Sequence, residues 1–498
     1  MSQDSSISGC LSRRPLGILE SFMFHQRDIG QRVGRDHWAF CIAFRLTFPP
    51  SIAKPIPCLR RAWQVLQWQH PALANTISSD SGGPYVTARP LDAESWADDT
   101  FVVDHTSTTA RDLLRTLLPT PTATCHWLSA SSELVLHSSH WRVDGVGVAM
   151  LLHQFMGALA QAAQLGPEAP LEALAPDSGR RLSLMPRIDD LSRPSARVGG
   201  EQDAFSAAFG EMQAKIARSG PGIGLPIRPG SAESVPGATD SALTRFDAAT
   251  TAKVMAACRA KKLTITAAIH AAIVRATAGY LQNPPATAFT SVLLVNLRRA
   301  LDVTATAETE DISTVVGSFF TGLPVCIESV LTKDGKRIKD FDSIADDLGQ
   351  VYNEDLVRLL TARDGSGLTA DLLDLGARYI QQKEKTPRVS VIEGAPPTET
   401  PELSSLCMIH KLVQTEYGSG SYERVTVDDI WIGIEIYNRY VQLHAWIWKG
   451  ELSLGACFNQ SFYEKDFVDD FLKRIMEELR EGCGVEKLLH GDIHTAKI

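Results

Sequence analysis

The sequence predicts an α+β fold of two lobes, and three observations support this prediction. The chain has 498 residues, well beyond the size at which a single hydrophobic core usually stops growing. Strand and helix patterns mix in both halves without a regular strand–helix–strand alternation, which favours layered lobes over a doubly wound parallel sheet. Between the halves, from about residue 165 to 241, apolar periodicity fades and Pro, Gly, Ser and Ala accumulate, which is typical of a linker.

These observations divide the chain into four parts. Residues 1–15 are polar and rich in serine, and we expect a flexible leader there. The N-terminal lobe is expected over 16–175, a crossover linker over 176–240, and the C-terminal lobe over 241–498. The linker keeps one stretch of apolar periodicity, over 204–217, which predicts a single helix within it.

In the first half, apolar patterns predict three strands and two helices. The strands are expected over 37–48, 124–129 and 133–138, where β-branched, aromatic and other apolar residues concentrate. The first helix is expected over 57–73 and ends near Pro71, because proline stops a helix. The second helix is expected over 146–162.

The second half has a similar mixture of elements. Helices are expected over 248–261, from Thr264 or Thr266 to 280, and over 341–360, 369–382 and 464–480. Strands are expected over 289–297, 317–327, 430–437, 441–448 and 451–458.

Charge excludes two classes of partner. The formal net charge is -9 at pH 7, and a polyanion attracts an acidic protein only through a dense basic patch. The densest basic run, over 333–339, is interrupted by Asp334 and followed by Asp340. We therefore expect a small-molecule substrate, no nucleic acid and no membrane surface, and we expect the protein to be a monomer.

The cysteines indicate a reducing compartment. Nine cysteines are scattered along the chain and none forms a C-x-x-C pair, so neither a disulfide framework nor a zinc site is predicted. The N-terminus lacks the apolar segment of a secretory signal, and we expect no 18-residue apolar run that would span a bilayer. These features predict a cytoplasmic enzyme.

The chemistry-bearing motif is H-x-x-x-D-G at His140, Asp144 and Gly145. It follows a predicted strand and precedes an apolar helix, and His140 is the one among 13 histidines with an aspartate four residues later. A neutral imidazole near pH 7 takes a proton from a hydroxyl or amine while that atom attacks an acyl carbonyl. No nucleophilic serine is indicated, because the chain has no G-x-S-x-G.

Several alternative interpretations of this segment remain open. His140 could be a buried histidine at a strand end, and Asp144 could simply cap the following helix. A metal site that includes His137 is disfavoured, because residues three apart on a strand point to opposite faces. A dinucleotide loop is also disfavoured, because Met150 occupies the third glycine position. We therefore expect no metal and no bound cofactor.

The motif and four other segments together resemble the HxxxD acyltransferases related to condensation domains and chloramphenicol acetyltransferase. The other segments are WQVLQWQHPAL (63–73), VNLR (295–298), GSFFTGLP (317–324) and ELSLGACFNQSFYEKDF (451–467). They occur in the order of that family and cover nearly the whole chain. The most similar subfamily is the fungal secondary-metabolite O-acetyltransferases, which includes trichothecene 15-O-acetyltransferase.

The resemblance implies two pseudo-symmetric chloramphenicol-acetyltransferase-like lobes with an active-site tunnel between them. It implies that His140 is the catalytic base, that Asp144 is structural, and that Arg298 pairs with Asp144. Ser404 and Ser405 resemble a polar strand that borders the tunnel. The alternatives are a solvated strand-end charge for Arg298 and ordinary loop polarity for the two serines.

The chain also departs from the family pattern. Condensation domains have a second histidine directly before the catalytic one, where this chain has Ser139. The arginine that follows their HPxL segment is replaced by Ala74 and Asn75. Arg142 lies close to Asp144 in sequence, but we expect it to point to solvent or to a ligand.

The sequence thus predicts an acyl-CoA-dependent O-acyltransferase that moves an acyl group, acetyl by preference, to a hydroxyl of a bulky secondary-metabolite acceptor. Two rival interpretations remain. In the first, the enzyme takes its acyl group from a carrier protein, as condensation enzymes do. In the second, the chain is a descendant that binds or cyclises a substrate in the same tunnel without acyl transfer.

Overall fold

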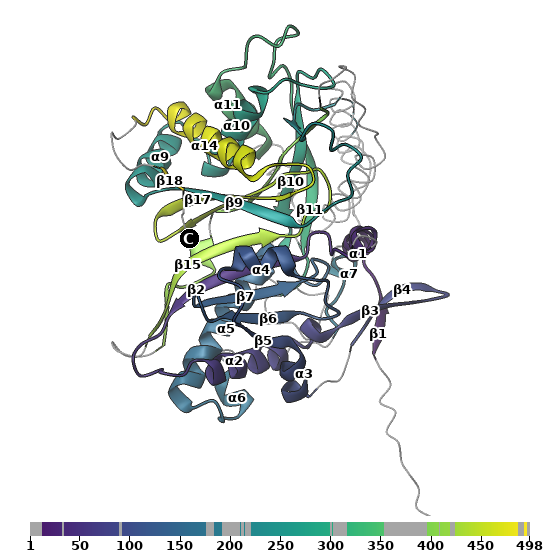
Figure 1. The fold of residues 1–498 in the computed structure, drawn as a ribbon, viewed down its shortest axis with the longest axis vertical. Coiled ribbons are helices and arrows are strands. Elements are labelled where there is room, and N and C mark those ends of the chain that lie inside the picture. Colours follow the sequence, from purple (N-terminus) through teal and green to yellow (C-terminus); the bar gives the residue numbers. More distant parts are fainter. Residues whose placement is uncertain are drawn as a thin grey trace, which may run out of the picture.

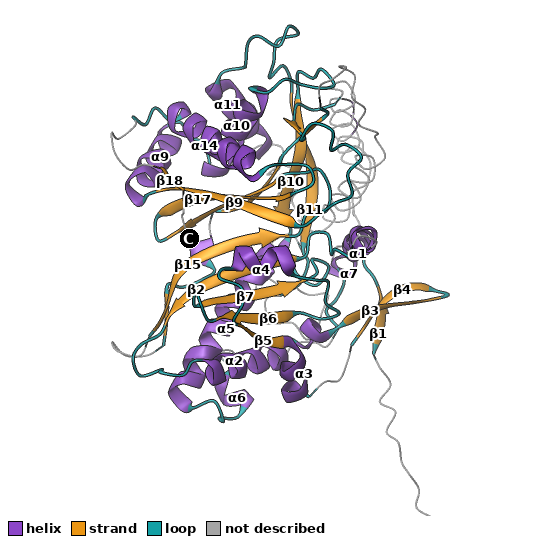
Figure 2. Ribbon diagram, viewed as in Figure 1, coloured by secondary structure: helices purple, strands orange, loops and turns teal. Residues whose placement is uncertain are grey.

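The chain folds into two α+β lobes that lie one above the other (Figure 1). The computed structural model describes residues 12–31, 34–88, 92–175, 184–191, 210, 214, 221–298, 301, 316–352, 396–407, 409–418, 424–486 and 493–495. In each lobe a mainly antiparallel sheet faces the other lobe, and helices cover its outer side (Figure 2). The helix expected over 369–382 lies outside the described residues, as does the helix expected over 204–217 apart from residues 210 and 214.

The first lobe is built on a six-stranded sheet in the order β14-β15-β2-β7-β6-β5. Its central strands are β2 (Phe40–Thr47) and β7 (Glu133–Ser138), flanked by β6 (Thr124–Leu128) and β5 (Phe101–Asp104). Most residues of β2 and all of β7 are buried, so burial does not alternate along these strands, as expected of strands covered on both faces.

Helices α2 (Ile56–Gln69) and α5 (Gly145–Leu165) pack on the outer side of this sheet. Helix α2 ends before Pro71, as predicted, and a short 3-10 turn spans Pro71–Ala74. Helix α5 is one residue longer at its start and three at its end than predicted.

Contrary to our expectation, α5 is long and apolar enough to cross a membrane, with a mean hydropathy of 1.4 over an 18-residue window. Two thirds of that window, 67%, is buried inside the protein, however. Burial on this scale is characteristic of a core helix, which is apolar because it is covered on more than one side.

The second lobe contains a seven-stranded sheet in the order β11-β10-β13-β16-β17-β9-β18. The sheet is antiparallel except that β13 (Glu402–Leu406) runs parallel to both of its neighbours. The other strands are β9 (Thr239–Phe246), β10 (Phe289–Asn296), β11 (Phe320–Ile327), β16 (Gln442–Trp448), β17 (Glu451–Asn459) and β18 (Ile493–Thr495).

Among the described residues, the helices that cover the outer side of the second sheet are α9 (Ala248–Ala260), α10 (Ile265–Ala278), α11 (Phe341–Gln350) and α14 (Lys465–Gly482). Thr264 caps α10 by accepting a hydrogen bond from Ala267 N, as its residue type predicts. In α14 the apolar residues repeat every three or four positions, and Val468, Phe471, Leu472, Ile475, Met476 and Leu479 are all buried.

One long strand from the second half of the chain crosses into the first lobe. β15 (Val425–Ile434) pairs with β2 over Phe40–Thr47 and carries the short β14 (Glu416–Tyr417) on its outer edge. β15 falls within the range 241–498 expected for the C-terminal lobe, yet it belongs to the sheet of the first lobe. The reason is that β2 would otherwise be an open edge, and β15 supplies its missing hydrogen bonds.

The N-terminal boundary also needs correction, because part of the expected leader is ordered. β1 (Arg13–Pro15) pairs with β4 (Gly83–Thr87), which pairs with β3 (Thr76–Asp80) in a small sheet at the side of the molecule. Helix α1 (Ile18–Gln31) follows, and Leu16, Leu19 and Met23 pack into the hydrophobic cluster of the second lobe. This segment therefore does not belong to the first lobe alone.

Candidate active site

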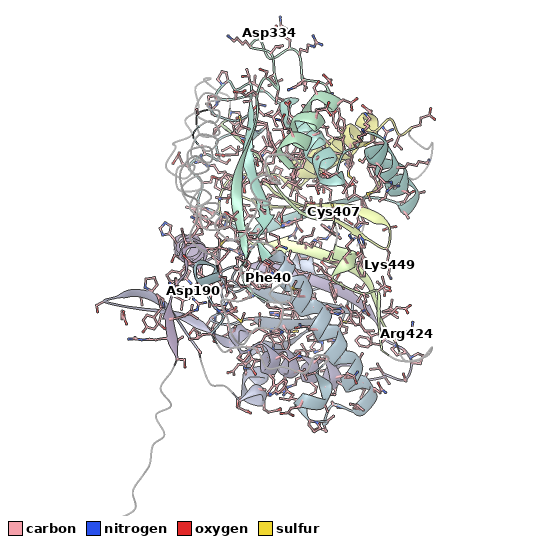
Figure 3. All side chains as sticks on the ribbon, turned by 180° about the vertical axis from the view of Figure 1, so that it is seen from behind. Phe40, Asp190, Asp334, Cys407, Arg424 and Lys449 are labelled. Atoms are coloured by element: carbon pink, nitrogen blue, oxygen red, sulfur yellow. The ribbon has the colours of Figure 1, made fainter. Side chains whose placement is uncertain are left out.

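A cavity of about 1330 Å³ lies between the lobes. Its walls come from α1, β2 and the start of α5 on one side, and from β10, β11, β13 and β16 on the other. The lining is mainly apolar with a few polar groups, which is typical of small-molecule sites. Figure 3 shows the junction from behind, with Phe40 labelled on the first-lobe side and Cys407 on the second-lobe side.

His140 lies on the wall of this cavity, in the turn between β7 and α5. Its ring faces Phe320 of β11 with 5.4 Å between the ring centroids. The Ser318 hydroxyl donates a hydrogen bond to the His140 carbonyl oxygen at 2.8 Å, which ties the histidine backbone to the second lobe. A residue held on both lobes is well placed to meet substrates bound between them.

Burial lowers the pKa of His140 below its ordinary value of 6.5, while its own backbone carbonyl and Asp144 act in the opposite direction. The ring is therefore neutral at pH 7, as a general base requires. Its Nδ1 is buried and has no hydrogen-bond partner among the described residues.

Asp144 does not serve His140 directly, because both of its carboxylate oxygens are occupied elsewhere. Oδ1 accepts from Gly147 N at 2.7 Å and from Arg298 Nη2 at 2.9 Å. Oδ2 accepts from Arg298 Nη1 and from Phe319 N, both at 2.8 Å. The expected ion pair and the alternative role as a helix cap are thus both present in one carboxylate.

Arg298 follows β10 and is only 3% exposed, so the alternative of a solvated strand-end charge is wrong. Besides Asp144 it donates to the Gly317 carbonyl oxygen at 2.9 Å, and that same oxygen accepts from Asp144 N at 3.1 Å. These contacts join the HxxxDG turn of the first lobe to the β10–β11 end of the second. Arginine fits this position because its planar fork satisfies both carboxylate oxygens.

The expectation that Arg142 points to solvent or ligand is wrong. Its guanidinium donates to the Asn75 carbonyl at 2.9 Å, to the Pro121 carbonyl, and to Ser138 Oγ at 3.1 Å, and it lies 4.3 Å from the centroid of the Trp141 ring. This arrangement is not predictable from the sequence, because the acceptor carbonyls belong to loops 67 and 21 residues away along the chain.

Ser139 takes the position of the second histidine of condensation domains and is turned into a buried polar cluster. Its hydroxyl donates to Asp36 Oδ2, and the same oxygen pairs with Arg27 Nε at 3.2 Å. Burial raises the pKa of Asp36. Ser139 therefore supports the turn that carries His140 and is not among the residues that line the cavity.

Ser404 and Ser405 both line the cavity and lie in β13, so the loop interpretation is wrong. Ser405 Oγ is 2.9 Å from Thr266 Oγ1 and 3.3 Å from Cys407 Sγ. His137 does not line the cavity with His140. Its Nδ1 lies instead 3.3 Å from Thr124 Oγ1. Within the described ranges, no three His, Cys, Asp or Glu side chains are grouped to bind a metal.

Two residues escaped the sequence analysis. His444 of β16 lines the cavity on the second-lobe side and is 5% exposed; strand alternation would have placed it on the same face as Gln442 and Trp446. Gly147, two residues beyond the motif glycine, is packed tightly: a Cβ there would lie 2.5 Å from Val143 Cγ2 and 3.1 Å from Arg298 Nη2. Gly145 has much more room, with Leu406 Cδ1 at 3.4 Å.

Sequence comparison finds relatives that match nearly the full length of the chain. Acetyltransferase pigO of Monascus ruber is 24% identical over 97% of this chain and 98% of its own length. O-acetyltransferase pigM of the same fungus is 26% identical over 91% of this chain and 82% of its own. A protein named Loline biosynthesis cluster 1 transcription factor lolU1, from Epichloe uncinata, is 26% identical over 97% and 96%.

Comparison of structures supports the predicted fold. The structure of TRI3 trichothecene 15-O-acetyltransferase from Fusarium sporotrichioides matches with a TM-score of 0.72 and 17% identity, over 96% of this chain and 97% of that one. The first condensation domain of the calcium-dependent antibiotic synthetase matches with a TM-score of 0.60 and 12% identity, over 95% and 97%. These likenesses establish the two-lobed chloramphenicol acetyltransferase fold.

A family match falls in the second half of the chain. The family described as phthiocerol/phthiodiolone dimycocerosyl transferase C-terminus matches residues 236–364, which include β9, α9, α10, β10 and β11. The chain is thus similar to an acyltransferase family over residues 236–364 and to the acetyltransferases pigO and pigM over most of its length, and it shares the chloramphenicol acetyltransferase fold.

Proposed function

We propose that the protein transfers an acetyl group from coenzyme A to a hydroxyl of a bulky, mostly apolar natural product. The observation that carries this proposal is the position of His140, a neutral imidazole on the wall of a large interlobe cavity. The names of pigO, pigM and TRI3 support acetyl as the group and a fungal secondary metabolite as the class of acceptor.

In this reaction His140 takes the proton of the acceptor hydroxyl as its oxygen attacks the thioester carbonyl carbon. A tetrahedral oxyanion forms and collapses, the carbon–sulfur bond breaks, and the coenzyme A thiolate receives the proton. The products are an ester and free coenzyme A. A positioned base of this kind contributes about 10²–10⁴ in rate, and orientation of the two substrates contributes further.

The Asp144–Arg298 pair supports this role indirectly. Both carboxylate oxygens of Asp144 already accept hydrogen bonds from Arg298 and from backbone amides. The carboxylate therefore does not accept a hydrogen bond from the His140 imidazole. Its contribution is to hold the turn between β7 and α5 against the second lobe. Such support keeps a reactive group within the narrow range of geometry that catalysis needs.

The proposal is tested by release of free thiol. Purified protein is mixed with acetyl-CoA and a panel of hydroxylated terpenoids and polyketides, and thiol formation is followed along with the mass of the product. Acceptor-dependent thiol release with a product 42 mass units heavier, about the mass of an added acetyl minus one hydrogen, supports the proposal. No release with any member, at saturating acetyl-CoA, contradicts it.

The same assay separates the rival functions. Ester formation only with an acetylated carrier domain supports a carrier-protein donor, which the likeness to condensation domains favours. A substrate that changes without any thiol release supports the non-transferring descendant. Because some relatives are named transcription factors, a mobility-shift assay with duplex DNA completes the set, and the net charge of -9 leads us to expect no shift.

A further inference from the structure

The second-lobe wall of the cavity contains a histidine that the proposed chemistry does not use. His444 lies in the middle of β16, is 5% exposed, and lines the same cavity as His140. Its Nδ1 is buried and has no hydrogen-bond partner among the residues that the structure describes. Since an unsatisfied buried polar group is unfavourable, its retention at this position calls for a ligand.

The register of the sheet shows what surrounds His444. Ser404 of β13 lies directly opposite it on one side, and Gly455 of β17 on the other. Directly opposite residues share a face of the sheet, so the imidazole has a hydroxyl on one flank and no side chain on the other. Ser404 also lines the cavity. Together the two residues form a polar subsite, which we call the His444–Ser404 subsite, beside Glu402 and Gln442, which pair with each other on the same strands and also line the cavity.

The chemistry of this subsite favours an uncharged oxygen. Burial, with the nearby His140 as a smaller cause, lowers the pKa of His444 to about 4. The ring is therefore neutral at pH 7, with one nitrogen that donates and one that accepts a hydrogen bond. A neutral imidazole beside a serine hydroxyl suits a hydroxyl or carbonyl, whereas a phosphate or carboxylate would require a cation.

We propose that the His444–Ser404 subsite hydrogen-bonds a second oxygen of the acceptor, on the second-lobe wall of the cavity that also holds His140. On this proposal, which rests on the proposed function for the reaction at the first hydroxyl, the acceptors carry a second hydroxyl or carbonyl oxygen and are not simple alcohols. His444 then acts as a specificity residue. The two imidazoles lie on opposite walls of the cavity, so the acceptor must present its two oxygens to different lobes.

The test measures binding of two matched fluorescent probes. 1-(2-Naphthyl)-1,2-ethanediol carries two adjacent hydroxyls, and 2-(2-naphthyl)ethanol lacks one of them. Their dissociation constants are measured by fluorescence anisotropy with the full-length protein. We expect the diol to bind the wild type about three- to tenfold more tightly, the range for one additional buried hydrogen bond. In His444→Leu, which fills the position without a polar atom, the two probes should bind equally.

Two variants control for structural effects. His444→Asn keeps an amide near the position of Nδ1 and should retain part of the preference for the diol. His270→Leu makes the same change at another buried histidine, on α10, which has an unpartnered Nε2 but does not line the cavity; its diol preference should equal that of the wild type. Thermal midpoints are recorded for all three variants.

The outcomes separate the subsite from the reaction. Equal binding of both probes to the wild type, binding of neither probe, or an unchanged preference in His444→Leu overturns the subsite, even if thiol release proceeds. Loss of the preference in His444→Leu alone supports the subsite, even if acetyl-CoA is never consumed. Loss in His270→Leu as well assigns the effect to general destabilisation and overturns the proposal.

Discussion

Asp144 and Arg298 meet across the lobe junction in a buried two-point ion pair, with N–O distances of 2.8 and 2.9 Å. The pair unites residues 154 positions apart in the chain. It also shares the Gly317 carbonyl oxygen, so the first-lobe turn and the second-lobe strand end are held as a unit.

Removal of either partner should be strongly destabilising, because it leaves a buried charge without compensation. Asp144→Ala and Arg298→Ala should each lower the free energy of unfolding by about 3–5 kcal/mol. Asp144→Ala should cost more, since Asp144 also accepts from Gly147 N and Phe319 N. Urea denaturation measures the free energy of unfolding of each variant. The loss of free energy in the double variant should be much smaller than the sum of the losses in the two single variants.

A surface pair provides the control for that cycle. Arg13 and Asp80 are 3.0 Å apart, but their side chains are 61% and 41% exposed. Arg13→Ala should therefore change the unfolding free energy by less than about 1 kcal/mol. Strict additivity of the two changes at the Asp144–Arg298 pair would show that the contact is not energetically coupled.

His140→Ala should abolish turnover and leave the thermal midpoint nearly unchanged. The base is lost, whereas positioning and oxyanion stabilisation remain, so we expect at least about a 10²-fold fall in kcat. The measurement is thiol release with the acceptor identified from the panel. A variant that keeps more than about a tenth of the wild-type rate would exclude the role of general base.

The pH dependence of kcat/KM should have an acidic limb below the ordinary histidine value. Burial lowers the pKa of His140 from 6.5, so the active neutral form persists to lower pH, and activity falls only as pH drops through that lowered value. Because burial lowers the pKa of His444 to about 4, an acidic limb of the profile above pH 5 is assigned to His140. A midpoint at or above 6.5 would contradict this prediction.

Two glycines of the same turn should respond differently to alanine. Gly147→Ala should lower the unfolding free energy by about 1–3 kcal/mol through overpacking, because the new Cβ would meet Val143, Arg298 and Gly317 at 2.5, 3.1 and 3.2 Å. Gly145→Ala should change it by no more than about 0.5 kcal/mol, since Leu406 lies at an ordinary contact distance of 3.4 Å. Equal effects in urea denaturation would show that the turn can relax around either methyl group.

Free acetyl-CoA should saturate the enzyme without a carrier domain. We expect a KM for acetyl-CoA between about 1 μM and 1 mM, the ordinary range for metabolites, in steady-state assays of thiol release. An initial rate that stays linear in acetyl-CoA beyond this range, together with activity on an acetylated carrier domain, would instead favour the carrier-protein donor.

The sequence predicted most of the elements that surround the site. Short runs rich in apolar, aromatic and β-branched residues located β6, β7, β16 and β17, and three- to four-residue periodicity located α2, α5, α10 and α14 to within a few residues. These signals are local, because each element is specified by which of its own faces is buried. The HxxxDG turn was likewise predictable, since a strand, a sharp turn and a capped helix follow one another directly.

Other features depend on contacts between distant segments. The sequence does not reveal that β15 completes the first-lobe sheet, since its apolar pattern would suit either sheet. The Arg142 side chain points inward because it donates hydrogen bonds to the carbonyls of Asn75 and Pro121, which lie in other loops. The sequence does not distinguish His444 from other histidines in strands. Its place on the cavity wall depends on its register with Ser404 and on the packing of the lobes.

By itself, then, the sequence determined the α+β class, the positions of most strands and helices, the HxxxDG turn and the candidate partners Asp144 and Arg298. The tertiary structure alone decided which lobe receives β15, how Arg298 reaches both oxygens of Asp144, and which side chains share the interlobe cavity. The physical reason is that the pattern of buried and exposed positions within one helix or strand depends on neighbouring residues in the sequence. Strand pairing and cavity walls depend instead on residues that come together only when the two lobes pack.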